Sequence, residues 1–214
     1  MVDFSDREEV FAEAVSARPM RPVKVTVIAV LGIILGVIYL LGCLTSIPGI
    51  LVQTLAPDAF NVDTSNQDPQ IQTQVEIQKR MAEVTRQYLP MLIGLTLASL
   101  LMGASLIYGS VQVLRNDRAA SYRFLANVCL AGIVVTILSA IFTTILQLAN
   151  WHAMDQTFLS VEVKGNIEMF RNIMQFSFIA GLVMGILYQL AQLLYFVLGR
   201  WVLAYQAANM TQED

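Results

Sequence analysis

Side chains able to do acid–base, nucleophilic or metal chemistry are scarce in this sequence and lie far apart along it. Its one histidine, His152, precedes Asp155 by three residues, and this pair is the closest approach to a catalytic arrangement. At that spacing a His and an Asp more often form a polar cluster at a membrane boundary than an acid–base pair. The two cysteines, Cys43 and Cys129, lie in separate apolar runs without the neighbouring ligands of a zinc site. We therefore expect no catalytic residue, no metal site and no cofactor.

A set of polar side chains lies inside an apolar segment near the C-terminus. Tyr188, Gln192 and Tyr195 recur at i, i+4 and i+7, which places them on one face of a helix, with Gln189 beside them. Such a polar stripe can line a water-filled path. More often it hydrogen-bonds neighbouring helices, because an unpaired amide is costly in hydrocarbon. The partners that the other apolar segments offer are Gln112, Asn127 and Gln147.

Small residues recur every four positions in three of the apolar segments. Such residues let helix backbones approach closely, which favours helix association in lipid. The pairs are Gly32 with Gly36, Gly94 with Ala98, Ser99 with Gly103, Ser105 with Gly109, and Gly181 with Gly185. We expect them to pack helices inside one bundle. The alternative is that one of these ridges faces another subunit.

Four long apolar segments must position these residues. Hydrophobic residues make up 56% of the 214 and charged residues 14%, against about 45–50% and about 25% in ordinary soluble domains. The charges cluster between apolar runs at residues 23–47, 89–114, 124–148 and 173–199. Each run is as long as the roughly 20 residues that a helix needs to cross a bilayer. The sequence predicts an all-α fold, an integral membrane four-helix bundle.

The basic residues predict the orientation of these helices, because Lys and Arg tend to stay on the cytoplasmic side. With the N-terminus inside, eight of the 13 Lys and Arg are cytoplasmic, and three of them lie in the short loop 115–123. Both termini are then cytoplasmic. Residues 1–22 form an amphipathic N-terminal segment, and residues 200–214 form a tail. A bacterial plasma membrane is favoured, since neither cysteine lies in an exterior loop where it could form a disulfide.

The exterior parts are predicted to be a loop and helix at 48–88 and a loop at 149–172. Asp68-Pro69 supplies a helix N-cap and a first-turn proline, and Ile77, Met81 and Val84 form an apolar stripe. Pro90 should bend this helix into the second span rather than end it. We expect the second and fourth helices to extend beyond the bilayer on the exterior side, with irregular chain between residues 149 and 165.

The first apolar run has an alternative interpretation. Leu40-Leu41-Gly42-Cys43 resembles the cleavage site of bacterial lipoproteins, in which the cysteine is lipidated and becomes the new N-terminus. Leu41 stands where a smaller residue is usual, the preceding polar segment is long and acidic, and the apolar run continues past Cys43. A retained helix is the better interpretation.

The functional prediction rests largely on what the apolar runs lack. None carries Asp, Glu, His, Lys or Arg at depth, although proton-coupled carriers and ion pumps usually need such groups there. A net charge of −3 without a basic block disfavours nucleic acid as a partner. We expect a non-enzymatic structural, assembly or regulatory subunit whose partners are membrane lipids and other membrane proteins or itself. The alternative is a small channel or uncoupled permease lined by the polar stripe.

Overall fold

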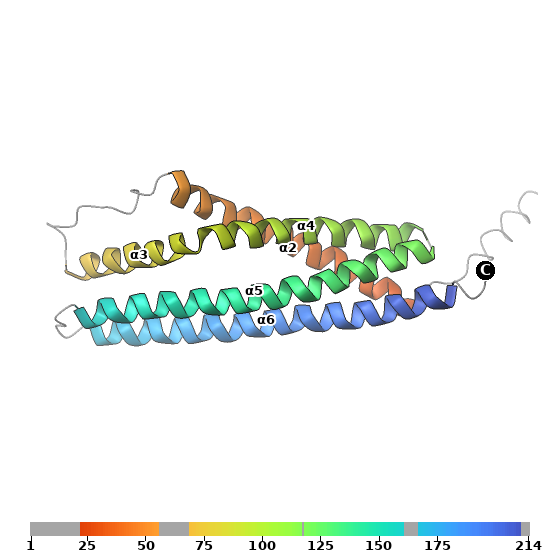
Figure 1. Cartoon of the computed structure of the whole chain (residues 1–214). Helices are drawn as coiled ribbons and strands as arrows, with labels where there is room; N and C mark the ends of the chain where they lie inside the picture. Colours follow the sequence, from red (N-terminus) through yellow and green to blue (C-terminus); the bar gives the residue numbers. More distant parts are fainter. Residues whose placement is uncertain (1–21, 56–68, 117, 161–166, 211–214) are drawn as a thin grey trace, which may run out of the picture.

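The described residues of the computed structural model, 22–55, 69–116, 118–160 and 167–210, form five α-helices and no strand. They are α2 (Val23–Leu55), α3 (Pro69–Gln87), α4 (Leu89–Arg115), α5 (Ala119–Ser160) and α6 (Ile167–Met210). Four of them, α2, α4, α5 and α6, are long and apolar enough to cross a membrane. The predicted all-α four-helix membrane bundle is confirmed (Figure 1).

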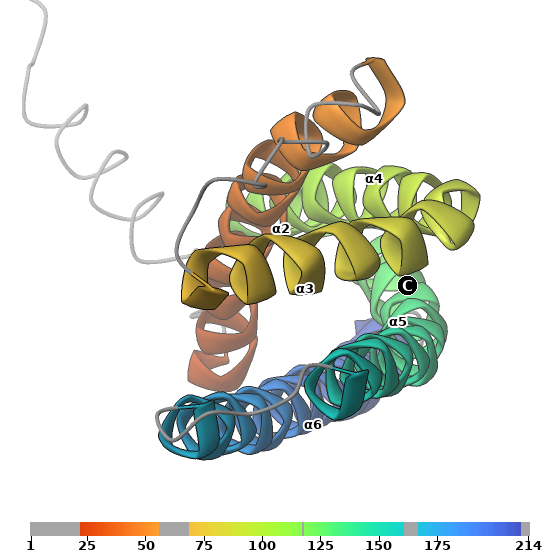
Figure 2. The same cartoon turned by 90° about the vertical axis from the view of Figure 1, so that its left-hand side faces the viewer.

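The four long helices form two pairs, α2 with α4 and α5 with α6, and α4 joins the pairs by packing on α5 (Figures 1 and 2). We call the end where α4 passes into α5, at residues 116–118, the turn end. The start of α2 and the end of α6 also lie there, while α3 marks the opposite end, here called the α3 end (Figure 1). The helices thus alternate in direction.

Helices α2 and α4 approach closely because glycines remove the side chains between them. A Cβ on Gly36 would lie 2.8 Å from the carbonyl oxygen of Gly103, and a Cβ on Gly103 would lie 2.9 Å from that of Gly36. Near the turn end, the Ser110 hydroxyl occupies the space beside Gly32. Toward the α3 end, the Cys43 thiol donates a hydrogen bond to the carbonyl of Thr96 at 3.4 Å. These contacts form one antiparallel seam.

A second antiparallel seam joins α5 and α6. The ring of Phe196, which is completely buried, packs on Gly132. Farther along, the rings of Trp151 and Phe178 lie 4.8 Å apart. Between the two seams, Gly109 of α4 gives room to α5, since a Cβ there would lie 3.0 Å from Leu125.

The main core lies at the turn end, where all four long helices meet. Its buried side chains are Val25, Ala29, Met102, Leu106, Val113, Tyr122, Leu125, Ala126, Val128, Cys129, Phe196, Leu203 and Ala207. A smaller cluster at the α3 end holds α3 on α5, with Ile77 and Met154 buried and Met81, Trp151 and Met174 packed around them. The middle of the bundle lies between these two packed regions.

Helix α3 continues almost directly into α4, with only Tyr88 between them, as the proline-bend prediction requires. The amides of Met91 and Leu92 both bond the Tyr88 carbonyl, at 3.1 and 3.0 Å. Pro90 lies in the first turn of α4, where its missing N–H costs no helical hydrogen bond. Asp68, the predicted N-cap, lies outside the described residues. So do residues 1–21 of the predicted N-terminal segment 1–22.

The helices extend beyond several predicted bounds. Helix α5 begins at Ala119, inside the predicted loop 115–123, and α6 continues past residue 199 to Met210, inside the predicted tail 200–214. Helix α2 does not stop at Ile47 but passes through Pro48 to Leu55. Pro48 has no N–H for the Leu44 carbonyl one turn earlier, and a membrane helix tolerates such a proline when neighbouring groups or local adjustments satisfy the freed carbonyl. In the preceding turn, the Thr45 and Ser46 hydroxyls both bond the Gly42 carbonyl, at 2.9 and 2.8 Å. Helix α5 continues past residue 148 to Ser160, because its later turns pack on α3 and α6. The third long helix therefore also extends toward the α3 end.

Candidate functional site

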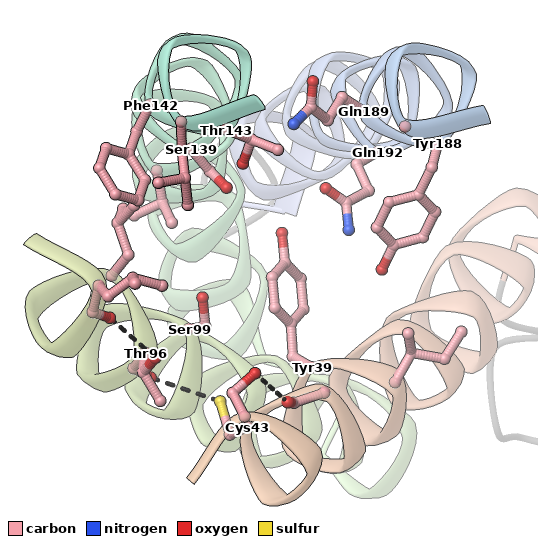
Figure 3. Close-up of a pocket in the computed structure, with 18 residues that line it drawn as sticks. Tyr39, Cys43, Thr96, Ser99, Ser139, Phe142, Thr143, Tyr188, Gln189 and Gln192 are labelled. Carbon is pink, nitrogen blue, oxygen red and sulfur yellow. Dashed lines mark hydrogen bonds between the residues drawn. The ribbon is translucent and has the colours of Figure 1, made fainter. Parts of the chain in front are cut away.

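A cavity of about 500 Å³ lies in the middle of the bundle, between the two helix pairs. All four long helices line it, and the polar side chains come from each of them. Those of α2 and α4 are Tyr39, Cys43, Ser46, Thr96 and Ser99, and those of α5 and α6 are Ser139, Thr143, Tyr188, Gln189 and Gln192. Figure 3 shows them distributed around the cavity, with Tyr39 and Gln192 pointing toward one another across its centre.

The cavity offers hydrogen bonds without charge. The remaining lining is apolar or glycine, including Ile38, Leu92, Leu95 and Phe142, and no Asp, Glu, His, Lys or Arg occurs among the lining residues that the structure describes. Gln192 is the deepest amide, with 6% of its surface exposed. It interacts with the Tyr188 hydroxyl one turn earlier on the same helix. The site can thus bind a molecule through neutral polar groups set in an apolar wall.

The cavity is closed toward the turn end. On the turns that follow its lining, Met102 and Leu106 of α4 and Phe196 of α6 are buried in the main core. There the Tyr195 hydroxyl ties α6 to α2 by donating a hydrogen bond to the Ile28 carbonyl at 3.1 Å. These contacts leave the cavity a blind pocket on that side.

The cavity is open sideways, between α2 and α6. Of the four sides of the bundle, this one has the fewest contacts between helices, because α2 leans away from α6 as it approaches the α3 end (Figure 2). The lining residues that are exposed at the surface are Ile38, Gly42 and Ser46 of α2 and Tyr188 of α6. Those contributed by α4 and α5 are half-buried or buried. The cavity is therefore open at the gap between α2 and α6, which we call its mouth.

The structure divides the predicted polar stripe. Tyr188 and Gln192 line the cavity, whereas Tyr195 lies below its floor and bonds α2. The partners predicted for Gln192 do not line the cavity. Asn127 is exposed, Gln147 is half-buried on α5, and the Gln112 amide donates to the Tyr108 hydroxyl at 3.0 Å within its own helix. Gln192 faces the side chains of the cavity instead (Figure 3).

The predicted small-residue ridges fall into two groups. Gly32, Gly36, Gly103 and Gly109 lie at close contacts between helices. A Cβ on Gly94, Gly181 or Gly185 would meet no atom within 4 Å, so these three pack against no helix in the part of the chain that the structure describes. Ser99 lines the cavity, and Ala98 and Ser105 are half-buried.

Two close-packing glycines do not belong to the predicted ridges. Gly132 receives the ring of Phe196, and a Cβ on Gly199 would lie 3.2 Å from the Cys129 sulfur. Neither has another glycine, alanine or serine four residues away. The available signal was only a lone glycine inside an apolar run.

Most of the cavity lining was also missed, although a signal existed. Tyr39, Cys43 and Ser46 have the same i, i+4, i+7 spacing as the polar stripe, and Ser139 and Thr143 lie four residues apart. Each of these sets marks one helix face. Only the packing of the four helices brings the faces together.

His152 and Asp155 do not form a pair. His152 is exposed, and the Asp155 carboxylate accepts a hydrogen bond from the Arg171 guanidinium at 2.8 Å, which links the ends of α5 and α6. Gly165, at which the irregular loop was expected to end, lies outside the described residues. The described part of the chain contains no group of three His, Cys, Asp or Glu able to hold a metal ion.

Comparison with known proteins leaves the cavity as the main guide to function. No family model matches the chain, and comparisons with curated proteins and with solved structures found no significant match.

Proposed function

We propose that this chain is a non-enzymatic membrane protein that acts by binding, as a regulatory or assembly subunit of a membrane complex. We propose that it holds an amphipathic molecule in the cavity between its helix pairs. The observation that carries the proposal is the cavity itself. Its volume of about 500 Å³ lies within the range of about 300–1,000 Å³ that is usual for small-molecule sites.

The lining supports binding rather than chemistry. Hydroxyl and amide groups can orient a ligand by hydrogen bonds, and the apolar wall can cover the rest of it. A general base or a strong nucleophile would call for a carboxylate, histidine or activated thiol beside the ligand. Among the described lining residues, the thiol of Cys43 is the one nucleophile of this kind, and it is buried and bonded to a carbonyl of α4.

A channel is the second candidate, because Tyr188 and Gln192 do line a cavity inside the bundle. The main core at the turn end argues against a channel. A continuous path would have to pass Leu106 and Phe196, which are completely buried. Solute flux would require this core to open.

Filling the cavity tests the binding proposal. Gly185 lines the cavity, and a Cβ there meets no atom within 4 Å, so Gly185→Phe adds a ring to the cavity without a backbone clash. Gly181 has the same open surroundings one turn away and does not line the cavity, which makes Gly181→Phe the matched control.

We expect native mass spectrometry in mild detergent to show one retained amphipathic molecule on the wild type and on Gly181→Phe, and none on Gly185→Phe. Retention by all three proteins, or by none, would contradict the proposal. Liposome flux of the wild type that Gln192→Leu abolishes, with the fold intact, would establish the channel instead.

A further inference from the structure

We propose that the ligand of the cavity is a neutral amphiphile, with one long apolar chain and an uncharged hydroxyl or ester head, and that it enters sideways from the bilayer between α2 and α6. This inference rests on the proposed function and names the chemistry and the route of its ligand.

The route follows from where the lining is exposed. Ile38 and Tyr188, on the two sides of the mouth, have 43% and 45% of their surfaces exposed. Both lie inside the stretches of α2 and α6 that are apolar enough to span the membrane, Val23–Val52 and Arg171–Met210. The surface outside such a stretch is lipid rather than water. A molecule already dissolved in the bilayer can therefore reach the cavity without crossing an aqueous phase.

The deep part of the cavity selects for a polar head. Gln192 is almost completely buried there, and Tyr39 points at it from α2 (Figure 3). The contact of Gln192 with the Tyr188 hydroxyl uses part of the hydrogen-bonding capacity of the amide, which has two donors and an oxygen that accepts. A ligand hydroxyl or ester carbonyl beside Gln192 and Tyr39 supplies a further partner, while its chain extends along the apolar wall toward the mouth.

The same lining selects against a charged head. The described lining residues supply no cation for a phosphate or carboxylate and no anion for an amine. On the long helices, Asp155 and Arg171 bond one another at the ends of α5 and α6, so their charges are already paired. Burial of an unpaired charge carries a large desolvation cost. A neutral lipid therefore binds in preference to a charged lipid with the same chain.

A matched pair of probes tests the head group. Monooleoylglycerol and oleoyl lysophosphatidic acid share the glycerol and the acyl chain and differ in the phosphate. With delipidated wild type placed in nanodiscs, we expect monooleoylglycerol to bind at least about tenfold more tightly than the phosphate. A tenfold difference in Kd is only a small part of the free-energy cost of burying an unpaired charge. Equal affinity, or tighter binding of the phosphate, would overturn the inference.

Two glutamine variants locate the head. Gln192→Leu removes the deep amide and should weaken monooleoylglycerol about three- to tenfold, the effect of one lost hydrogen bond. Gln112→Leu makes the same chemical change outside the cavity and should leave affinity unchanged. If both variants bind as the wild type does, the head does not lie at Gln192 and the inference is wrong.

A photoreactive monooleoylglycerol with its diazirine at the chain end tests the route. Peptides of α2 around Ile38 and of α6 around Tyr188 should carry the label, because the chain end lies in the mouth. Labelling confined to α4 and α5 would overturn the sideways route.

The outcomes also separate this inference from the proposed function. If the wild type retains a ligand that Gly185→Phe lacks, but that ligand is charged or is not displaced by monooleoylglycerol, the binding function stands and the neutral class fails. If no protein retains any ligand and neither probe binds, both fail.

Discussion

At the residue scale, the glycines of this protein have two different roles that the sequence pattern does not separate. Gly36 and Gly103 face one another's carbonyl oxygens, so that neither can carry a side chain without moving a backbone. Gly42, Gly181 and Gly185 adjoin open space. A small residue in the first group sets the distance between helices, whereas one in the second group leaves room for lipid or ligand.

This difference predicts opposite outcomes for the same substitution. Gly36→Ala should destabilise the bundle by about 1–3 kcal/mol, the usual cost of overpacking, because its Cβ would lie 2.8 Å from the Gly103 carbonyl oxygen. Gly181→Ala should change stability by less than about 1 kcal/mol, since alanine favours the helix and meets no neighbour. Thermal unfolding in one detergent compares them. Equal losses would show that the seam between α2 and α4 is not closely packed.

At the element scale, α3 continues almost directly into α4 and packs on α5. Ile77 is 2% exposed and lies against Met154, with Trp151 and Met174 beside it. Most other side chains of α3 whose surroundings are described are half-buried or exposed. Among residues 74–87, Ile77 is therefore the most deeply buried contact of α3.

Ile77→Ala should release α3 without unfolding the long helices. Loss of a packed isoleucine side chain costs about 2–5 kcal/mol, and Ile77 is the one buried side chain of α3 among residues 74–87. Amide exchange should accelerate across residues 74–87 and stay slow in α4 and α5. The control is Gln78→Ala at an exposed position of the same helix. Slow exchange in both variants would mean that other contacts hold α3.

The long helices could be predicted from sequence, but the cavity could not. Length and hydropathy are properties of each segment alone, and they identified all four apolar helices. The ends of α2 and α5 were harder to predict: α2 passes through Pro48 to Leu55, and the last turns of α5 pack on other helices. The site depends on neighbours even more, because Tyr39, Ser139 and Gln192 belong to three different helices.

At the scale of the whole molecule, the start of α2, the turn at 116–118 and the end of α6 share one end of the bundle (Figure 1). We predict that this end is cytoplasmic, since exposed Lys24, Arg115, Arg118 and Arg200 all lie near it.

Single cysteines test this orientation. Gln78→Cys, on an exposed face of α3, should react with an impermeant thiol reagent in intact cells. Ala120→Cys, exposed at the turn end, should react only after the cells are opened. The native cysteines are buried, and Cys→Ser variants remove any background. The reverse labelling pattern would place the turn end outside the cell and the α3 end in the cytoplasm.

The seam between α2 and α4 has a consequence for synthesis of the protein. Gly36 meets Gly103, which follows it far along the chain, with α3 and the preceding segment between them. During translation, α2 enters the membrane before α4 exists. Until the second span arrives, the glycine face of α2 has only lipid or the insertion machinery to cover it. A ribosome stalled between the two spans should therefore leave α2 reversibly associated with that machinery, and completion of α4 should free it.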